Sequence, residues 1–397
     1  MTTREHDPVV GYIEPVSNLD EPDGSGEAAI YVHFPFCRHL CTYCDFDTFT
    51  GLDHLIDRYV SAATRQIEMS PPVQATSLYV GGGTPNIMLP EQVASLIDGC
   101  RQRFRLQPEA EATIEANPTD MDLDHLLGFR RAGFNRLSVG VQSANARLLR
   151  LLGRRHTAED ASASLRTARE AGFDNVSADL IYGIPLQDLS IWRDTLQTVV
   201  EWGVDHLSCY MLTVEPGTPI DRGVSRGTLQ LPPEEEVVAM YELARDLLST
   251  AGYRHYEISN WALPGHESAH NLTYWRNQPY LAIGAGAAGY WAGRRYKLLP
   301  NVRAYMDGAR EGKIPLCEDE VEDPRRSASE TLILGLRLDE GVSFDTYSRR
   351  HGGSPDDVYG EALLWGEDAG LLVRADGRLK LTQRGVLLSN ELFERLL

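Results

Sequence analysis

The chain has 397 residues, of which 42% are hydrophobic and 24% charged, a composition typical of a folded protein with one large α/β domain and a smaller second one. Its formal net charge of −19 disfavours a nucleic-acid-binding role, because such proteins present a basic patch or stripe. An acidic surface that keeps the protein soluble is the simpler interpretation.

The first segment, residues 1–27, is rich in Glu, Asp, Pro, Gly and Ser, and we expect a flexible acidic tail outside the fold. It lacks the basic start and apolar stretch of a secretory signal, and the chain has no apolar run long enough to span a membrane. We therefore expect a cytoplasmic protein, for which transient membrane docking stays open. Cysteines in that compartment are thiols or metal ligands rather than disulfides, and Cys100, Cys209 and Cys317 are isolated packing residues.

From residue 28 onward, short β-branched or aromatic runs alternate with stretches that have helical spacing. Gly133 and Gly172 each stand between a helical stretch and the next run, as expected for a glycine that closes a helix. Repeated βα units predict a parallel sheet covered by helices, and six units predict an incomplete (β/α)6 barrel of the TIM type over residues 28–216. In such folds the chemistry lies at the carboxyl ends of the strands. The six predicted strands are 28–34, 77–82, 111–117, 136–141, 175–183 and 206–214.

Beyond the barrel, residues 217–322 are expected to extend it. The acidic start of 231–259 predicts a helix followed by a strand, whereas 261–299 is expected to form loops and short strands. Residues 323–397 contain helical patterns and a hairpin with Asp-Gly at its turn, which resembles a winged-helix unit. Without a basic cluster, this unit is expected to serve packing rather than DNA binding.

Three cysteines, Cys37, Cys41 and Cys44, follow the first predicted strand at C-x3-C-x2-C spacing. A structural zinc ion takes four ligands, so three on one loop leave such a site incomplete. A 4Fe-4S cluster also takes four protein ligands, one for each iron. With three thiolates one iron stays open, and an open iron can bind the amino and carboxylate groups of a small molecule. From these residues alone, both the zinc and the cluster interpretation stay open.

This cysteine loop resembles that of the radical S-adenosylmethionine (SAM) superfamily, in which a reduced 4Fe-4S cluster cleaves SAM to a 5′-deoxyadenosyl radical. Further motifs resemble the HemN-like group, which contains oxygen-independent coproporphyrinogen III dehydrogenase and the HemW haem-chaperone branch. The resemblance runs from about residue 29 to the C-terminus. The motifs are Y-V-H-F-P-F-C at 31–37, G-G-G-T-P at 81–85, I-E-A-N-P at 114–118, G-V-Q-S at 140–143 and D-L-I-Y-G-I-P at 179–185.

The residues of these motifs have the chemistry that SAM binding needs. Consecutive glycines let backbone groups approach a ligand, and a carboxylate within an apolar strand is rarely buried without a partner. A tight turn and structural ion pairs are the alternatives. The resemblance implies that SAM is surrounded by Tyr31, Tyr43, Gly82, Gly83, Thr84, Glu115, Gln142, Arg154 and Asp179.

Residues 284–289, G-A-G-A-A-G, formally match the glycine fingerprint of dinucleotide-binding proteins. That fingerprint requires a helix next, whereas the following residues, 290–299, read as another strand. We therefore predict no nicotinamide site. In the resembling family such a segment lies near the mouth of the active site.

Two features favour the haem-chaperone branch over the dehydrogenase. The dehydrogenase pattern has a fourth cysteine where this chain has Phe46, and a longer N-terminal segment. His270 opens H-N-L-T-Y-W, which resembles a stretch of the chaperone branch, and imidazole is a common axial ligand of haem iron. A hydrogen-bonded packing histidine is the alternative. The branch commonly has a further histidine where this chain has Ala288.

The resemblance thus predicts a cytoplasmic haem chaperone that carries a 4Fe-4S cluster, SAM and haem and delivers haem to haemoproteins. A reductant such as flavodoxin or ferredoxin is the expected electron donor. SAM cleavage is expected to be within its capability, but the sequence assigns no catalytic residue. The alternatives are coproporphyrinogen III dehydrogenase, whose activity is not expected here, and a HemN-like radical SAM methyltransferase.

Overall fold

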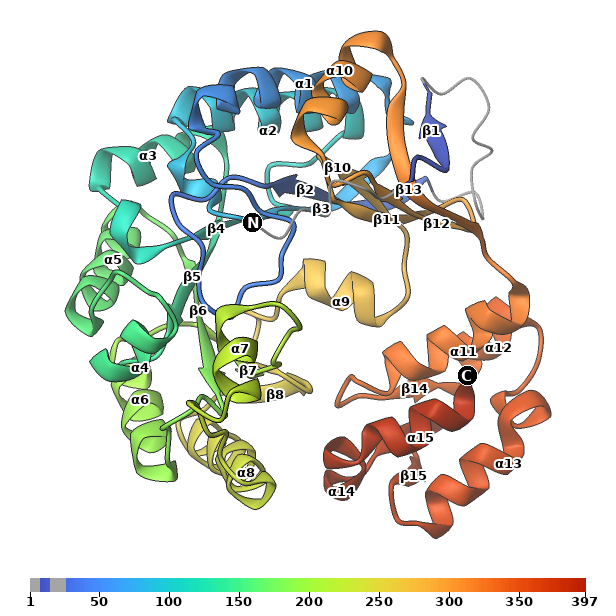
Figure 1. Cartoon of the computed structure of the whole chain (residues 1–397). Helices are drawn as coiled ribbons and strands as arrows, with labels where there is room; N and C mark the ends of the chain where they lie inside the picture. Colours follow the sequence, from blue (N-terminus) through green and yellow to red (C-terminus); the bar gives the residue numbers. More distant parts are fainter. Residues whose placement is uncertain (1–7, 15–25) are drawn as a thin grey trace.

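The computed structural model describes residues 8–14 and 26–397, and its central feature is a curved sheet (Figure 1). Six consecutive strands pair in parallel and in chain order, so the predicted partial (β/α)6 barrel is confirmed. The strands are β2 (Glu27–Phe34), β3 (Gln74–Gly82), β4 (Glu111–Ala116), β5 (Arg136–Gln142), β6 (Asn175–Tyr182) and β7 (His206–Met211).

Apolar and polar side chains alternate along these strands, so the two faces of the sheet differ in chemistry. Residues such as Ile114 and Val139 are fully buried in the main hydrophobic core, where each contributes about 1.5–3 kcal/mol. The neighbouring positions carry polar groups such as Glu115 and Ser138, which lie side by side in the parallel register. The outer surface of the sheet is covered by α1 (Ile56–Met69), α2 (Pro90–Phe104), α3 (Leu123–Ala132), α4 (Ala146–Leu151), α5 (Ala158–Glu170), α6 (Leu189–Glu201) and α8 (Glu234–Thr250) (Figure 1).

Helix ends follow the signals in the sequence. Asp122 caps α3 by accepting from the backbone N–H of His125, and Gly133 closes the helix with a φ of 117°. Thr157 begins α5 in a capping box with Asp160, and Gly172 follows its end with a φ of 89°. Both glycines adopt the left-handed conformation that the sequence predicts.

Strands from later in the chain cover both edges of the six-stranded unit. On one side β10 (Tyr280–Ile283) pairs in parallel with β2, and on the other β9 (Asn260–Ala262) pairs antiparallel with β7. The sheet reaches 13 strands among the described residues. The remaining elements here are α7 (Pro219–Ser225), β8 (Arg254–Glu257), β11 (Ala288–Trp291), β12 (Arg294–Leu298), α10 (Val302–Glu311) and β13 (Ile314–Val321).

Two expectations need correction. Within the segment predicted to be a flexible tail, Gly11–Ile13 form β1, which pairs antiparallel with β13; residues 1–7 and 15–25 lie outside the described part of the chain. The stretch predicted as loop and strands contains a helix, α9 (Ala269–Trp275), on the inner side of the sheet (Figure 1). The carboxylate of Glu111 accepts from the backbone N–H groups of residues 269 and 270, a stabilisation of the helix start that local sequence does not reveal.

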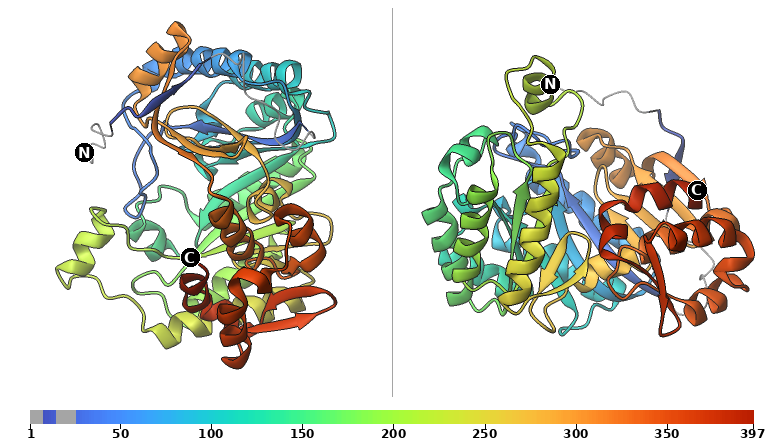
Figure 2. Two further views of the ribbon diagram at one scale, coloured as in Figure 1. Left: turned by 90° about the vertical axis from the view of Figure 1, so that its right-hand side faces the viewer. Right: turned by 90° about the horizontal axis from the view of Figure 1, so that it is seen from below.

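Residues 323–397 have a hydrophobic core of their own, separate from that of the barrel. They lie across the molecule from α3 and α5 (Figures 1 and 2). The predicted hairpin is confirmed, with positive φ at Asp376 and Gly377 in its turn. The elements are α11 (Pro324–Gly335), β14 (Val342–Ser343), α12 (Phe344–His351), α13 (Pro355–Asp368), β15 (Leu372–Ala375), β16 (Arg378–Leu381), α14 (Gln383–Leu387) and α15 (Ser389–Leu396).

None of the helices in the described residues combines the length and apolar character needed to cross a bilayer.

Candidate functional site

The three cysteines lie in the loop that follows β2. Cys37 is 8% exposed, and its backbone N–H donates to the carbonyl of Phe49 at 2.9 Å, which closes the loop. Burial raises the pKa of the Cys37 thiol and raises that of Cys44 to about 11. Both thiols therefore stay protonated at pH 7 unless a cation takes the place of the proton.

The number of thiols can be compared with the ligands that each metal centre needs. Three thiolates can bind three irons of a 4Fe-4S cluster and leave the fourth iron without a protein ligand. A structural zinc ion takes four ligands, one more than these cysteines provide. Within residues 8–14 and 26–397, no group of three His, Cys, Asp or Glu side chains is arranged to hold one metal ion.

A chain of hydrogen bonds connects two of the cysteines through Thr84 and Asn117, which follow β3 and β4, and through Arg154, which lies between α4 and α5. Arg154 donates to Sγ of Cys41 at 3.5 Å and to Oδ1 of Asn117 at 2.6 Å. Asn117 in turn donates to Oγ1 of Thr84 at 3.0 Å, and the Thr84 hydroxyl donates to Sγ of Cys37 at 3.4 Å. Each donor in this chain orients the next acceptor, so the two sulfur atoms are positioned together.

Glu115, at the end of β4, has both carboxylate oxygens occupied. Oε1 accepts from the Tyr79 hydroxyl at 2.8 Å and Oε2 from the backbone N–H of Gly82 at 2.9 Å. Burial nevertheless raises the pKa of Glu115 to about 7. This carboxyl therefore changes charge near neutral pH, inside the barrel and beside the glycine segment.

Asp179 and Gln142 lie on neighbouring strands. Asp179 accepts from the Ser138 hydroxyl at 3.1 Å, and burial raises its pKa. Gln142 has a φ of 65° at a bulge between β5 and β6, in the left-handed region that a residue with a side chain rarely adopts. Beside this bulge the carbonyl of Gly140 accepts from Arg154 at 2.6 Å.

The glycines of residues 81–83 are required for packing within the protein. A Cβ on Gly83 would lie 2.5 Å from the carbonyl oxygen of Phe36, and one on Gly82 would lie 2.4 Å from the ring of His33. The absence of side chains lets β3 approach the cysteine loop, so that Thr84 N–H donates to the carbonyl of Phe36 at 2.9 Å. The glycines were predicted to let the backbone approach a ligand; in the structure they also let β3 pack against His33 and Phe36.

The two predicted tyrosines have different surroundings. The hydroxyl of Tyr31 bonds Nδ1 of His33 at 2.9 Å, and Nε2 of His33 bonds the carbonyl of Asp47 at 3.0 Å. Because a carbonyl only accepts, Nε2 carries the proton and Nδ1 accepts from Tyr31. Tyr43 packs against a small apolar cluster that includes Ile181 and Ile184, and burial raises its pKa.

The 284–289 segment packs against the cysteine loop. A Cβ on Gly286 would lie 3.0 Å from that of Asp47, and the Asp47 carboxylate pairs with Lys297 of β12 at 3.0 Å. One strand was predicted after this segment. The structure has two antiparallel strands, β11, which begins within the segment at Ala288, and β12. A strand thus stands where the dinucleotide fingerprint requires a helix. Phe46 is 70% exposed, and Ala288 is an exposed residue at the start of β11.

His270 lies apart from the cysteine loop, in α9, with a side chain that is 1% exposed. Its Nδ1 bonds the Ser77 hydroxyl at 2.9 Å, its Nε2 bonds the Tyr274 hydroxyl at 2.8 Å, and its ring stacks on Tyr79. Burial lowers its pKa to about 3, so the ring is neutral. In this conformation neither ring nitrogen is free to bind iron.

Three groups near the site escaped the sequence analysis. Asn117 connects Arg154 with Thr84, and Tyr79 orients Glu115. Burial raises the pKa of Asp179, and the charge of the fully buried Arg136 offsets part of that rise. Asn117 belongs to the I-E-A-N-P motif, so its place in a motif was an available signal. Tyr79 and Arg136 could have been found from strand alternation, since both occupy inward-facing polar positions.

Comparison with known proteins identifies relatives over nearly the whole chain. The model of the radical SAM superfamily matches residues 31–199, and that of the HemN C-terminal domain matches residues 323–388. The haem chaperone HemW of Lactococcus lactis is 35% identical over 92% of this chain and 96% of its own length. HemW of Bacillus subtilis is 36% identical over 91% of this chain and 97% of its own.

Similarity extends to an animal protein and to a solved structure. A mitochondrial radical S-adenosyl methionine domain-containing protein 1 of Bos taurus is 37% identical over 81% of this chain and 75% of its own. Among solved structures, coproporphyrinogen III oxidase (HemN) of Escherichia coli matches 96% of this chain and 91% of its own with a TM-score of 0.80. Its sequence identity is 24%, so that likeness concerns the fold.

Proposed function

This chain belongs to the HemW haem-chaperone family of the radical SAM superfamily, and from that membership we propose that it binds haem and delivers it to haemoproteins. The observation that carries the proposal is the extent of the match, which covers 96% and 97% of two curated haem chaperones. Both the barrel and the C-terminal domain are included, so the likeness is not that of a shared cofactor domain alone.

Within this proposal Cys37, Cys41 and Cys44 hold a 4Fe-4S cluster. When bound, the cluster supplies an iron without a protein ligand, at which the amino and carboxylate groups of SAM can bind. The burial of the thiols and their hydrogen bonds from Thr84 and Arg154 support this assignment, because N–H and O–H donors stabilise sulfur that carries negative charge.

The polar groups at the strand ends are proposed to hold SAM. Glu115 and Asp179 are buried carboxyls with raised pKa values, and a cationic ligand would favour their charged forms. Gly82, Gly83 and Thr84 present the backbone beside Glu115, and the remaining proposed contacts are Tyr31, Tyr43, Gln142 and Arg154. SAM, with its sulfonium and ammonium charges, has the chemistry that these carboxyls favour.

Phe46 supports the chaperone function over the dehydrogenase. It replaces the further cysteine of the dehydrogenase pattern, and its ring is largely exposed rather than part of the loop's packing. His270 stays a proposed haem ligand. Its two hydrogen bonds imply that ligation requires Ser77 or Tyr274 to give up its contact.

A direct test uses the full chain with its cluster reconstituted anaerobically. The protein is loaded with haem and mixed with an excess of an apo-haemoprotein, and transfer is followed by the Soret spectrum of the acceptor. Transfer faster than from free haem is expected. In parallel the protein is incubated with SAM, a reductant and coproporphyrinogen III. Formation of protoporphyrinogen without haem transfer would contradict the proposal.

The electron donor, with flavodoxin or ferredoxin as the expected classes, and the cytoplasm as the place of delivery stay predictions.

A further inference from the structure

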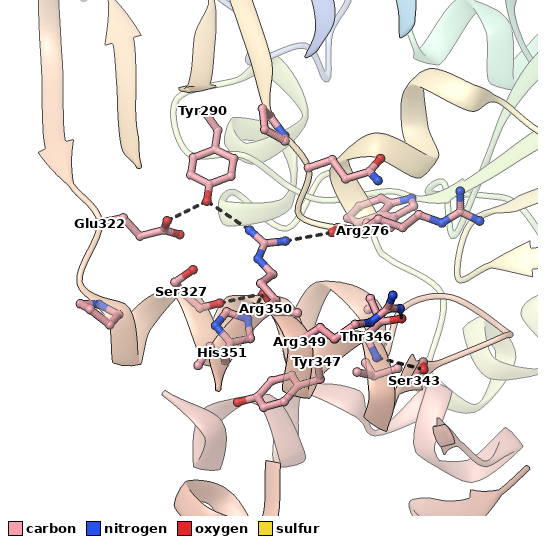
Figure 3. A pocket seen from close by; sticks show the side chains of 18 of the residues that line it. Arg276, Tyr290, Glu322, Ser327, Ser343, Thr346, Tyr347, Arg349, Arg350 and His351 are labelled. Atoms are coloured by element: carbon pink, nitrogen blue, oxygen red, sulfur yellow. Dashed lines mark hydrogen bonds between the residues drawn. The ribbon is translucent and has the colours of Figure 1, made fainter. Parts of the chain in front are cut away.

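A large cleft lies at the amino ends of β2 and β3, far from the cysteine loop in the barrel. It has a volume of about 1660 Å³ and separates the end of α9 and the β11 strand from α11, α12 and α13 (Figure 3). Pockets that enclose small ligands usually measure about 300–1,000 Å³, so this cleft can admit a ligand as large as a tetrapyrrole. Nothing in the proposed cluster and SAM sites uses it.

The cleft differs in charge from the rest of the molecule. It is lined by five arginines and four carboxylates, whereas the chain as a whole carries a net charge of −19. Two of the arginines pair with Glu340, but Arg325, Arg349 and Arg350 form no ion pair with any carboxylate of the described residues. Arg349 and Arg350 donate to carbonyl and hydroxyl oxygens only. Guanidinium groups without a carboxylate partner favour an anionic ligand, and guanidinium can bind a carboxylate in a bidentate manner.

Aromatic side chains form part of the same wall. Trp275, Tyr290, Trp291 and Tyr347 line the cleft. Tyr290, Trp291 and Tyr347 are buried, so the half-buried Trp275 offers most of the aromatic surface that a planar macrocycle could contact. Arg350 donates to the Tyr290 hydroxyl at 3.2 Å (Figure 3). It also donates to the carbonyl of Asn277 at 2.7 Å. These bonds connect α12 to β11 and to the segment after α9.

His351, the last residue of α12, also lines the cleft. Its Nε2 bonds Oγ1 of Thr331 at 3.1 Å. Thr331 gives its own proton to the carbonyl of Ser327 at 2.9 Å, so its oxygen must accept from His351. Nε2 therefore carries the proton, and Nδ1 keeps a lone pair that has no hydrogen-bond partner in the described residues. Burial and the nearby Arg350 lower the pKa of His351, which favours the neutral ring.

The two histidines considered as iron ligands are thus in opposite states. His270 uses both ring nitrogens in hydrogen bonds inside the barrel, whereas His351 uses one and borders an open cleft. A neutral imidazole whose other N–H is oriented by a fixed acceptor is the usual form of a metal-ligating histidine.

We propose that the cleft between α9 and α12 is a haem site, in which Nδ1 of His351 ligates the iron and the propionates pair with Arg325, Arg349 and Arg350. This inference rests on the proposed haem-chaperone function and specifies where the haem is held. The site belongs to both the barrel extension and the C-terminal domain, so it requires the whole chain.

The test is a haem titration of the reconstituted full chain, followed by the Soret band and by quenching of tryptophan fluorescence. His351→Ala is expected to weaken haem binding about 10-fold or more, as losses at metal ligands and their partners do. The double variant Arg325→Glu with Arg349→Glu changes two exposed side chains and is expected to weaken binding at least roughly 5-fold through lost ion pairs. His54→Ala and Arg303→Glu, both exposed and outside the cleft, are the matched controls.

The possible outcomes separate the two proposals. If the wild type binds and transfers haem but the cleft variants behave like the controls, the cleft is not the site and the proposed function stands. If only His270→Ala loses binding, the iron ligand is in α9 and this inference is wrong. A wild type that binds no haem contradicts the proposed function and the inference together. Should His351→Ala fail to fold, the arginine variant decides the matter.

Discussion

At the carboxyl ends of the strands, hydrogen bonds from Arg154, Asn117 and Thr84 tie the cysteine loop to three strands, and nearly every polar group there has a partner. At the amino ends, the cleft beside α12 contains arginines without carboxylate partners and a histidine with one uncommitted nitrogen. Side chains at the carboxyl ends of the strands thus hold one another in place, whereas the cleft at the amino ends has groups that are available to bind a ligand.

The difference suggests a division of labour between the two ends. A cluster site benefits from rigid ligands, because small displacements of a coordinating sulfur weaken binding. A site that must release its cargo benefits from partners that are exposed and individually weak, since exposed ion pairs contribute only about 0–1 kcal/mol each. The following predictions test this contrast, from the largest expected effect to the smallest.

Cys37→Ser should prevent assembly of the 4Fe-4S cluster at the carboxyl ends of the strands. Loss of one of three thiolates is expected to remove essentially all of the 4Fe-4S absorbance and the iron content per chain after reconstitution. Cys317→Ser, at a half-buried cysteine of β13, should retain both. If the cluster lies at the carboxyl ends and haem binds in the cleft at the amino ends, haem titration of Cys37→Ser should still show binding.

Asn117→Ala should disconnect Arg154 from Thr84. Two partly buried hydrogen bonds are lost, whereas Arg154 keeps its bond to Gly140 and Thr84 its bond to Cys37. We therefore expect the protein to lose about 1–2 kcal/mol of unfolding free energy and part of its cluster occupancy. Asn117→Asp keeps the acceptor for Arg154 but cannot donate to Thr84 while ionised. Its stability and cluster content should lie between those of the wild type and Asn117→Ala. Denaturant unfolding and iron analysis measure these effects; unchanged cluster content in both variants would show that the connection is unimportant.

Glu111→Gln should loosen α9. The carboxylate accepts from the backbone N–H groups of Ala269 and His270, and an amide cannot accept through its nitrogen. A cost of roughly 1–2 kcal/mol and faster hydrogen exchange across α9 are expected. Glu109→Gln, two residues away and exposed, is the control. Haem affinity should be unchanged if His351 is the ligand, but should rise if His270 must be released to bind.

Glu115→Gln should alter the dependence of stability on pH. The pKa of Glu115 is raised to about 7, so the folded protein holds this proton where the unfolded chain has lost it. The contribution of Glu115 to stability is therefore greatest below the unfolded pKa and is lost as pH rises through 7, by about 1 kcal/mol between pH 6.5 and 8. Buried histidines with lowered pKa values, such as His206 and His270, act in the opposite direction, because the unfolded chain still protonates them near pH 6.5. The Glu115 contribution is therefore the difference between wild type and variant at each pH, measured by denaturant unfolding without SAM.

Strand positions were predictable from sequence because each strand combines β-branched residues with buried alternation, as in the run that became β6. Helix α9 was not, since its seven residues include three β-branched or aromatic ones and its start depends on Glu111, far away in the sequence. Gly11–Ile13 were missed for a similar reason. Their strand exists through pairing with β13 rather than through local preference.

The candidate site shows the same limit. Glu115, Gln142 and Asp179 were predicted at strand ends, and they lie on β4, β5 and β6. Spacing could not reveal which atoms they contact. The state of His270 was equally hidden, because its two partners, Ser77 and Tyr274, come from different elements. The cleft beside His351 depends on how the C-terminal domain meets the barrel, which no local pattern encodes.

The pairing of β10 with β2 has a consequence for synthesis of the chain. The strand that leads into the cysteine loop has β3 on one side and residues 280–283 on the other. During translation, β2 is therefore an unprotected sheet edge until those residues have left the ribosome, and such edges invite aggregation. A fragment ending near residue 216 would expose that edge permanently, together with the one on β7 that β9 covers. Iron loading in the cell is thus best timed after the middle of the chain has emerged.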